Sequence, residues 1–141
     1  MSRQSLPRIP GFALLRKLGA GASGSVFHAI QDGTDREVAL KLFDPVDQPD
    51  AALPEDVERE RRVAASLRHR NLARIHAIGE YGESRWLACE YLPGGTLAER
   101  IAARMPLPQV LDTVRDIARG LGHAHARGVV HGDVKPGNVL F

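Results

Sequence analysis

The segment GAGASGSVFHAI, residues 19–30, decides between two folds. Its first eight residues fit the pattern G-x-G-x-x-G-x-V, in which glycines let backbone amides approach phosphate oxygens closely. A dinucleotide-binding fold would begin a helix after the third glycine. Here SVFHAI is short, contains Val26 and Phe27, and runs directly into the turn at residues 31–34. The segment therefore predicts a strand-turn-strand flap, with a glycine-rich hairpin that binds no ligand as the alternative.

The flanking sequence continues this strand pattern. FALLRKLG, from Phe12, and REVALKLF, residues 36–43, predict the neighbouring strands. In the latter, Val38, Leu40 and Leu42 share one face, and Ala39, Lys41 and Phe43 share the other, because strand side chains alternate. The stretch LARIHAIGEYGESRWLACEYL, residues 72–92, predicts two more strands around a glycine-containing turn. The first ten residues are expected to be disordered.

Helices are predicted in three places. One should run from about Glu55 to Leu67, because Pro54 suits a first helical turn and acidic residues follow it. A short helix is expected from Thr96 to about Ala103. A longer one is expected from Pro108 to Ala126, where apolar residues recur at spacings of three and four: Val110, Leu111, Val114, Ile117, Ala118 and Leu121.

Glu60 lies along the apolar side of the first of these helices. It follows Val57 by three residues and precedes Ala64 by four, with no basic residue at either spacing. A carboxylate turned toward a core needs a partner, since an unpaired buried charge is costly. Lys41, on a strand face with apolar neighbours, is the natural candidate. The alternative is that the helix rotates slightly and Glu60 is hydrated.

The segment HGDVKPGN, residues 131–138, brings together three kinds of polar group. Phosphoryl transfer needs a carboxylate near the attacking hydroxyl, a cation to balance charge, and an oxygen ligand for Mg²⁺. Asp133, Lys135 and Asn138 supply one of each. A rival metal site built from His123, His125, His131 and Asp133 is disfavoured, because histidines two residues apart on a helix face in different directions.

These parts occur in the order of the protein kinase signature, which the chain resembles from residue 12 to its last residue. The glycine loop is followed by VALK, ending at Lys41, and Glu60 lies 19 residues later. RHRNLARI, residues 68–75, CEYLPGGTL, residues 89–97, and HGDVKPGN complete the series. The resemblance is to serine/threonine protein kinases of the bacterial type.

The resemblance implies an α+β, protein-kinase-like fold. Residues 1–11 would be an N-terminal tail, and residues 12–92 a complete N-lobe and hinge, with a five-stranded antiparallel sheet and one helix. Residues 93–141 would begin a helical C-lobe that is truncated at the catalytic loop. The family's D-F-G aspartate, a second metal ligand, would fall beyond Phe141, so we expect little or no phosphotransfer by residues 1–141 alone.

The resemblance also implies roles for single residues. The glycine loop would cover the phosphates of ATP, Lys41 would hold the α- and β-phosphates while paired to Glu60, and Cys89 would be the gatekeeper. The backbones of Glu90 and Leu92 would bind the adenine edge. The full set of implied cofactor-binding residues is Leu18, Gly19, Gly21, Gly24, Val26, Ala39, Lys41, Cys89, Glu90, Leu92 and Leu140.

In the terminal loop, Asp133 would accept the proton of a substrate hydroxyl, Lys135 would balance charge, and Asn138 would bind Mg²⁺. Aminoglycoside- and choline-type phosphotransferases also contain HGD followed by P-G-N. Lys135 favours a protein serine/threonine substrate over those small molecules.

Gly132 stands where many kinases have an arginine that pairs with a phosphorylated activation loop, so this mode of regulation is in doubt. A non-catalytic nucleotide- or partner-binding module is the other alternative.

Composition excludes several other classes. The net charge of +2 over 141 residues is a weak electrostatic footprint, so nucleic-acid binding is not expected. No stretch approaches the roughly 20 apolar residues of a membrane span. The single cysteine, Cys89, cannot form an internal disulfide, which suits the cytoplasm.

Overall fold

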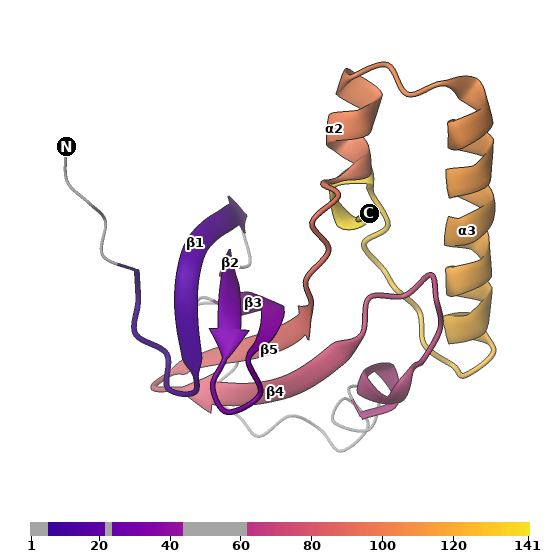
Figure 1. The fold of residues 1–141 in the computed structure, drawn as a ribbon. Coiled ribbons are helices and arrows are strands. Elements are labelled where there is room, and N and C mark those ends of the chain that lie inside the picture. Colours follow the sequence, from indigo (N-terminus) through magenta and orange to yellow (C-terminus); the bar gives the residue numbers. More distant parts are fainter. Residues whose placement is uncertain (1–5, 22–23, 44–61) are drawn as a thin grey trace. The chain divides into compact units, whose positions relative to one another are not determined.

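A computed structural model describes residues 6–21, 24–43 and 62–141 of the chain. The contacts divide it into two units, residues 1–54 with 75–91 and residues 55–74 with 92–141. Figure 1 shows that the first contains the β-sheet and the second contains the labelled helices. The two units are described separately.

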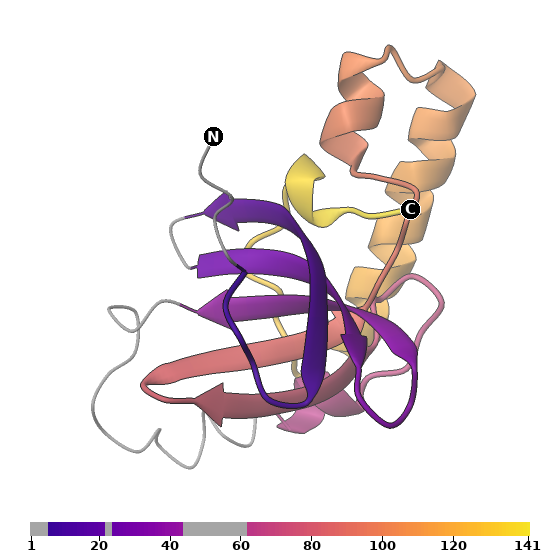
Figure 2. The ribbon, with the colours of Figure 1, turned by 60° about the vertical axis from the view of Figure 1, so that its left-hand side comes forward.

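The sheet has five antiparallel strands: β1 (Phe12–Gly21), β2 (Gly24–Gln31), β3 (Arg36–Phe43), β4 (Ile75–Tyr81) and β5 (Ser84–Glu90). Their spatial order is β1-β2-β3-β5-β4, so β5 lies between β3 and β4 (Figure 2). All five strands predicted from the sequence are confirmed. The hairpin between β1 and β2 confirms the strand-turn-strand interpretation of the glycine segment over the helix of a dinucleotide-binding fold.

One face of the sheet carries the hydrophobic core. Val38 and Leu40 of β3 are fully buried there, and they pack with Ala29, Ala88 and Phe12. Phe12 meets the indole of Trp86 edge-on, with ring centroids 4.9 Å apart, and Trp86 packs against this cluster. The predicted alternation of β3 is confirmed, because Val38, Leu40 and Leu42 all belong to or contact this core.

Ile9 also belongs to this core, so the expectation of disorder through residue 10 is wrong at this position. Its side chain is only 1% exposed, and its carbonyl oxygen accepts a hydrogen bond from the amide of Phe12. Gly11, with φ of +84°, then turns the chain into β1, and its carbonyl is bonded by the amide of Asp32. Ile9 lies between Arg8 and Pro10 in a short segment with two prolines, which gave no periodic pattern from which this packing could be predicted.

Strand β1 is irregular at two points. Its register against β2 shifts between Leu14 and Arg16, and again between Lys17 and Gly19. Leu15 and Leu18 are the extra residues at these two shifts. Neither has a pairing partner in β2, and both are exposed. Such bulges add a residue to one strand and change which face the following side chains occupy.

The second unit contains α2 (Leu97–Ala102), α3 (Leu107–His125) and the short 3₁₀ helix η2 (Pro136–Asn138). Residues 62–66 are also helical; the rest of the helix predicted from Glu55 lies outside the described residues. The short helix predicted from Thr96 is confirmed, and its start is fixed by a capping box. The Thr96 hydroxyl accepts from the Glu99 amide at 3.2 Å, and the Glu99 carboxylate accepts from the Thr96 amide at 2.6 Å.

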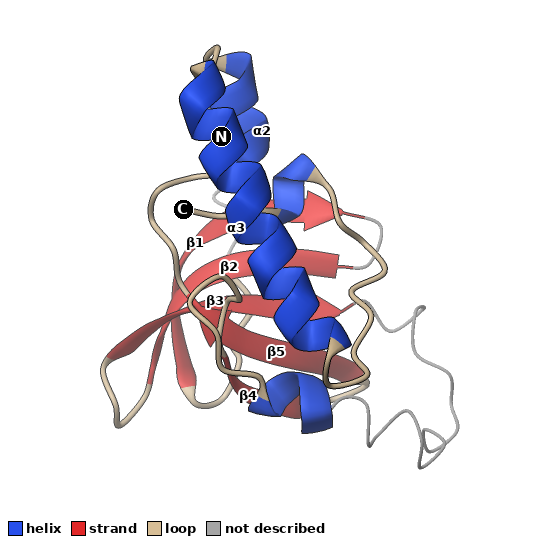
Figure 3. Ribbon diagram, turned by 90° about the vertical axis from the view of Figure 1, so that its right-hand side faces the viewer, coloured by secondary structure: helices blue, strands red, loops and turns tan. Residues whose placement is uncertain are grey.

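Helix α3 begins one residue before the predicted start, and Ala126 is its C-cap. Figure 3 shows it as the long helix of the second unit. Its buried positions are Thr113, Gly120 and Ala124, whereas Leu111 and Val114 of the predicted apolar stripe are 62% and 57% exposed. Val110, Ile117 and Leu121 of the same stripe are half-buried, on the side of the helix that carries Thr113, Gly120 and Ala124. The stripe therefore correctly predicted a helix and part of its buried side, which also includes small residues.

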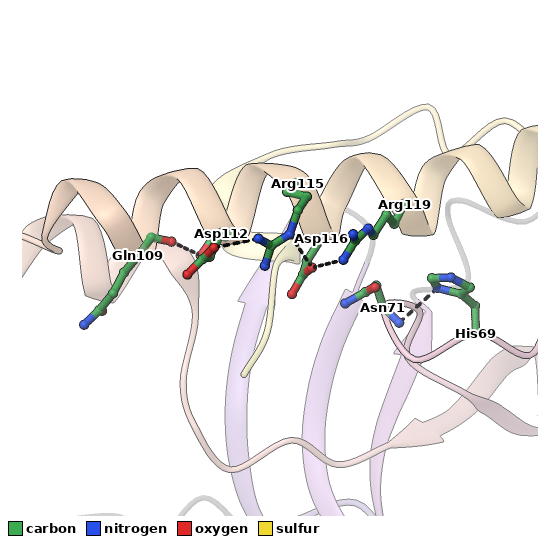
Figure 4. Close-up of polar contacts among 8 residues, drawn as sticks. His69, Asn71, Gln109, Asp112, Arg115, Asp116 and Arg119 are labelled. Carbon is green, nitrogen blue, oxygen red and sulfur yellow. Dashed lines mark hydrogen bonds and ion pairs between the residues drawn. The ribbon is translucent and has the colours of Figure 1, made fainter.

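Helix α3 contacts the segment around Asn71 of the same unit. A Cβ at Gly120 would lie 2.5 Å from the Asn71 carbonyl oxygen, so this packing requires glycine. Next to it, the rings of His69 and His123 are 4.8 Å apart. Figure 4 shows His69 and Asn71 beside the helix, and a chain of ion pairs along it that joins Asp112, Arg115, Asp116 and Arg119.

None of the helices in the described part of the chain has the length and hydropathy needed to cross a bilayer.

Candidate functional site

Four of the predicted nucleotide-binding residues lie on the sheet face opposite the core. Val26 of β2 is directly across from Lys41 of β3, and Ala39 of β3 is directly across from Cys89 of β5. Cross-strand partners point to the same side of a sheet, and alternate residues of one strand do the same. Because Leu40 points into the core, Ala39 and Lys41 must point away from it. The pairing thus brings Val26, Ala39, Lys41 and Cys89 onto one surface.

Lys41 and Cys89 share an electrostatic environment on this surface. The Lys41 ammonium lies over the ring of Phe43, 4.8 Å from its centroid, which confirms that residues 41 and 43 share a face. The Cys89 thiol donates a hydrogen bond to the Ala39 carbonyl at 3.4 Å. Burial raises the pKa of the Cys89 thiol, and the nearby positive charge of Lys41 opposes that shift. Cys89 is therefore a protonated thiol at neutral pH, as expected of a small packed side chain.

The three glycines of the loop differ in whether the fold requires them. Gly24 has φ of +132°, and a Cβ there would overlap the Leu42 carbonyl oxygen of the neighbouring strand. The fold itself therefore needs glycine at residue 24. At Gly19 and Gly21, a Cβ would meet no atom of the described chain within 4 Å. Packing within the described residues therefore does not require glycine at either of these two positions.

The terminal loop brings Asp133, Lys135 and Asn138 into direct contact. The Asp133 carboxylate oxygen Oδ2 lies 2.9 Å from the Lys135 ammonium and accepts a hydrogen bond from Asn138 Nδ2, also at 2.9 Å. Asn138 Nδ2 donates to the Asp133 carbonyl as well, at 2.8 Å. No hydrogen bond within the described residues uses Asp133 Oδ1 or Asn138 Oδ1. One oxygen of each side chain is therefore left for a hydroxyl group or a cation.

Local backbone structure holds this cluster together. Helix η2 ends at Asn138, which turns its side chain back toward Asp133. The amide of Asp133 donates to His131 Nδ1 at 3.2 Å. Gly132, between them, has φ of +76°, a conformation that residues with a Cβ rarely adopt. Glycine at residue 132, where many kinases have an arginine, therefore suits the turn that directly precedes Asp133.

The pKa of Asp133 is lowered from its ordinary value. The hydrogen bond from Lys135 is the largest cause, followed by that from Asn138. Both donors stabilise the ionised carboxylate. Asp133 is thus an anion at neutral pH, as a proton acceptor must be.

The remaining predicted residues lie in both units or outside the described residues. Leu18 directly precedes Gly19 at a register shift of β1 and is 38% exposed. Glu90 ends β5 in the first unit. Leu92 and Leu140 belong to the second unit, where Leu140 pairs with Thr96. Glu60 lies outside the described residues, so its predicted pairing with Lys41 stays a prediction.

Sequence reasoning missed a polar cluster on the same sheet face. The ring of His28 stacks on that of Tyr91, with centroids 3.8 Å apart and 15° between the planes. Arg16 donates to the Tyr91 hydroxyl at 2.9 Å, and His28 Nε2 lies 3.0 Å from the Glu37 carboxylate. These residues are up to 75 positions apart in sequence, so no local pattern connects them.

Comparison with known proteins gives consistent matches. A family model described as "Protein kinase domain" matches residues 12–141. Serine/threonine-protein kinase PknI of Mycobacterium tuberculosis is 34% identical over 135 residues, which cover 93% of this chain and 23% of PknI. PknF of the same organism is 33% identical over 135 residues and is covered to 28%. The chain thus spans about a quarter of the length of these relatives.

Solved structures agree with these matches. The crystal structure of the M. tuberculosis PknI kinase domain, C20A mutant, superposes with a TM-score of 0.83 at 33% identity, covering 99% of this chain and 58% of that one. Another structure of the same kinase domain gives a TM-score of 0.81, with 95% and 56% covered. The similarity extends through both units of the chain.

Proposed function

We propose that this chain, which belongs to the protein kinase family, is part of a serine/threonine protein kinase that transfers the γ-phosphate of ATP to protein hydroxyl groups. The relatives PknI, PknJ and PknF are serine/threonine-protein kinases. ATP is the phosphate donor in this proposal, and Mg²⁺ is the cofactor.

The Asp133 cluster is the observation that carries the proposal. Its carboxylate is ionised, is held at Oδ2 by two donors, and keeps Oδ1 available to a substrate hydroxyl. As the hydroxyl oxygen attacks the γ-phosphorus, its proton passes to Asp133 and the bond to the leaving ADP breaks. Lys135, 2.9 Å from the carboxylate, places a positive charge near the negative charge of the moving phosphoryl group.

The donor set suits the proposed cofactor. Asn138 uses its amide nitrogen on Asp133, so its amide oxygen is the atom that would bind Mg²⁺, a cation that prefers oxygen ligands. Mg²⁺ would neutralise charge on the phosphates of ATP. Lys41 would hold the α- and β-phosphates, with Glu60 as its partner.

The sheet face opposite the core supports the proposed nucleotide site. Val26 and Ala39 offer a small apolar surface suited to a flat base, and Cys89 lies directly across from Ala39 on the same face. Leu18 and Leu140 would add apolar contacts, and the backbones of Glu90 and Leu92 would bind the base edge. Gly19 and Gly21 would let the backbone approach the phosphates.

Lys135 also supports a protein substrate rather than an aminoglycoside or choline. We further propose that these residues act in the cytoplasm, because ATP is abundant there and the single cysteine suits a reducing compartment.

The test is a phosphotransfer assay with Mg-ATP on the intact gene product, using its own Ser and Thr residues and a general protein substrate as acceptors. We expect Asp133→Asn to reduce incorporation at least about 100-fold, because it removes the proton acceptor. Lys41→Met should cause a similar loss. Equal incorporation by all three proteins would show that the kinase proposal is wrong, as would phosphorylation of an aminoglycoside or choline in preference to protein.

Asp112→Asn is a matched control for Asp133→Asn. Both carboxylates are 63% exposed, and each is paired to a cation, at 2.8 Å for Asp112 and 2.9 Å for Asp133. Asp112 lies on the surface of α3, outside the terminal loop. The control should keep wild-type incorporation, because an exposed ion pair contributes little to stability.

A further inference from the structure

Two histidines meet where α3 packs against the segment around Asn71. The rings of His69 and His123 are 4.8 Å apart, and their planes are tilted by 37°. Both side chains are half-buried, and both belong to the second unit. Figure 4 shows His69 and Asn71 beside the helix, where Gly120 packs against the Asn71 carbonyl oxygen. This histidine pair is therefore part of the packing between α3 and the segment.

The hydrogen bonds of the histidine pair decide which ring nitrogens carry protons. The Asn71 amide donates to His69 Nδ1 at 3.1 Å, and Arg127 Nη1 lies 3.2 Å from His123 Nδ1. A backbone amide and a guanidinium can only donate, so both Nδ1 atoms are unprotonated acceptors and each neutral ring carries its proton on Nε2. The pair does not suit a metal bound at Nε2, since a metal-bound histidine donates its other ring N–H. Protonation of either ring would break its contact at Nδ1.

The charges around His123 also oppose its protonation. Arg127 donates to the His123 carbonyl oxygen as well, at 3.1 Å, which holds the guanidinium beside the ring. Neither ring of the pair is joined to a carboxylate of the described residues, and Arg119, one helical turn earlier, is paired with Asp116. Burial lowers the pKa of His123 from its ordinary value, and the positive charges of Arg127 and of a protonated His69 lower it further.

We infer that the histidine pair and Arg127 form an acid-sensitive switch: it holds the end of α3 against the segment around Asn71 at neutral pH and releases it on acidification. Protonation at Nδ1 would place a proton against the donor from Asn71 or Arg127. It would also bring positive charges together in a half-buried contact, where they repel. Arg127 lies six residues before Asp133, so the switch adjoins the start of the terminal loop. The inference goes beyond the proposed function and does not depend on it.

Acid should weaken this contact, and a rise in pH should not. Because the pKa of His123 is lowered by folding, the unfolded chain takes up this proton at a higher pH than the folded chain. The contact is therefore at full strength above about pH 6.5, the ordinary value for histidine. It is lost as the pH falls through the lower pKa of the folded state.

Hydrogen exchange of the intact gene product, followed by mass spectrometry from about pH 7.5 to about pH 5, tests the switch. The rates are corrected for the intrinsic pH dependence of exchange. Peptides that cover residues 67–72 and 122–129 should then lose protection about three- to tenfold on acidification, because hydrogen bonds at both Nδ1 atoms break. Peptides from β2 and β3 should keep their protection, since the switch lies in the other unit.

The double variant His69→Asn with His123→Asn removes both titrating rings but keeps an acceptor at each position. The Oδ1 atom of asparagine can accept from the Asn71 amide or from Arg127, and asparagine and histidine have similar helix propensities. Its protection should not change with pH in this range. His125→Asn is the matched control, because His125 lies two residues away on the same helix and is exposed. The control should keep the wild-type response.

Variants of Arg127 test the switch without changing either ring. Arg127→Ala removes a positive charge beside His123, so the midpoint of the acid response should move to higher pH. Arg127→Lys keeps the charge and a donor, and it should keep a midpoint closer to that of the wild type.

Four results would overturn the inference. The first is unchanged protection of the wild type on acidification. The second is a wild-type response in the double variant, because the titrating group would then lie elsewhere. The third is an equal loss of protection in β2 and β3, since acid would then act on the whole fold. The fourth is an Arg127→Ala midpoint at or below the wild-type pH.

Discussion

Replacing Gly24 with alanine should destabilise the sheet far more than the same change at Gly21. Both glycines belong to one loop, and they are paired with each other across the hairpin. At Gly24, the added Cβ meets the Leu42 carbonyl oxygen, and φ is +132°. At Gly21, it meets no atom of the described chain within 4 Å. The structure therefore predicts that a change from glycine to alanine strongly destabilises the fold at residue 24 and hardly affects its stability at residue 21.

The cost at Gly24 has two parts. A residue with a Cβ in a glycine-only region of backbone space costs about 1–3 kcal/mol. The overlap adds about 1–3 kcal/mol of packing strain, because the Leu42 oxygen is backbone and lies in the strand paired with β2. The sum of about 2–6 kcal/mol is a large part of the roughly 5–15 kcal/mol that stabilises a typical protein.

Thermal and urea unfolding followed by circular dichroism would measure this difference. Gly24→Ala should lower the melting temperature by roughly 10 °C or more. Gly21→Ala should stay within about 2 °C of the wild type. Under the proposed function it should also weaken ATP binding, because the added Cβ would obstruct the approach of the phosphate oxygens. The reasoning would be refuted if Gly24→Ala melted with the wild type, or if Gly21→Ala melted as low as Gly24→Ala.

Two further predictions concern the terminal loop. Lys135→Ala removes the main cause of the lowered Asp133 pKa, so the acidic limb of the pH-rate profile should move to higher pH; a shift to lower pH would contradict this assignment. Gly132→Ala forces alanine to φ of +76° and should cost about 1–2 kcal/mol in urea unfolding. Gly137→Ala, also with open space around its Cβ but without positive φ, should cost less than about 0.5 kcal/mol, and equal costs would count against backbone strain.

The regular elements could be predicted because each follows from a local pattern. Alternation in REVALKLF identified both faces of β3, since strand side chains alternate whatever the neighbours are. The periodicity of α3 likewise predicted a helix close to its observed bounds. It identified only part of the buried side: Val110, Ile117 and Leu121 are half-buried there, but Gly120 and Ala124 pack closely through small size rather than hydrophobicity.

The candidate site was predictable where its residues are close in sequence. Asp133, Lys135 and Asn138 lie within six positions, and they are in contact. The contact between His28 and Tyr91 depends instead on strand pairing over 63 positions, which no sequence window contains. The G-x-G-x-x-G pattern does not distinguish among its three glycines. In the structure only Gly24 is necessary for the fold, because only there would a Cβ overlap the backbone of β3.

The two bulges of β1 make the length of this strand as important as its composition. Because Leu15 has no partner in β2, Arg16 pairs with His28. Because Leu18 has none, Gly19 pairs with Val26. Deleting either leucine would rotate the residues on one side of the deletion to the opposite face, since side chains alternate. Replacing a leucine by another residue keeps the count. The fold of strand β1 should therefore tolerate substitutions at these two exposed positions while rejecting in-frame deletions there, although a substitution at Leu18 would still remove the apolar contact proposed with the base.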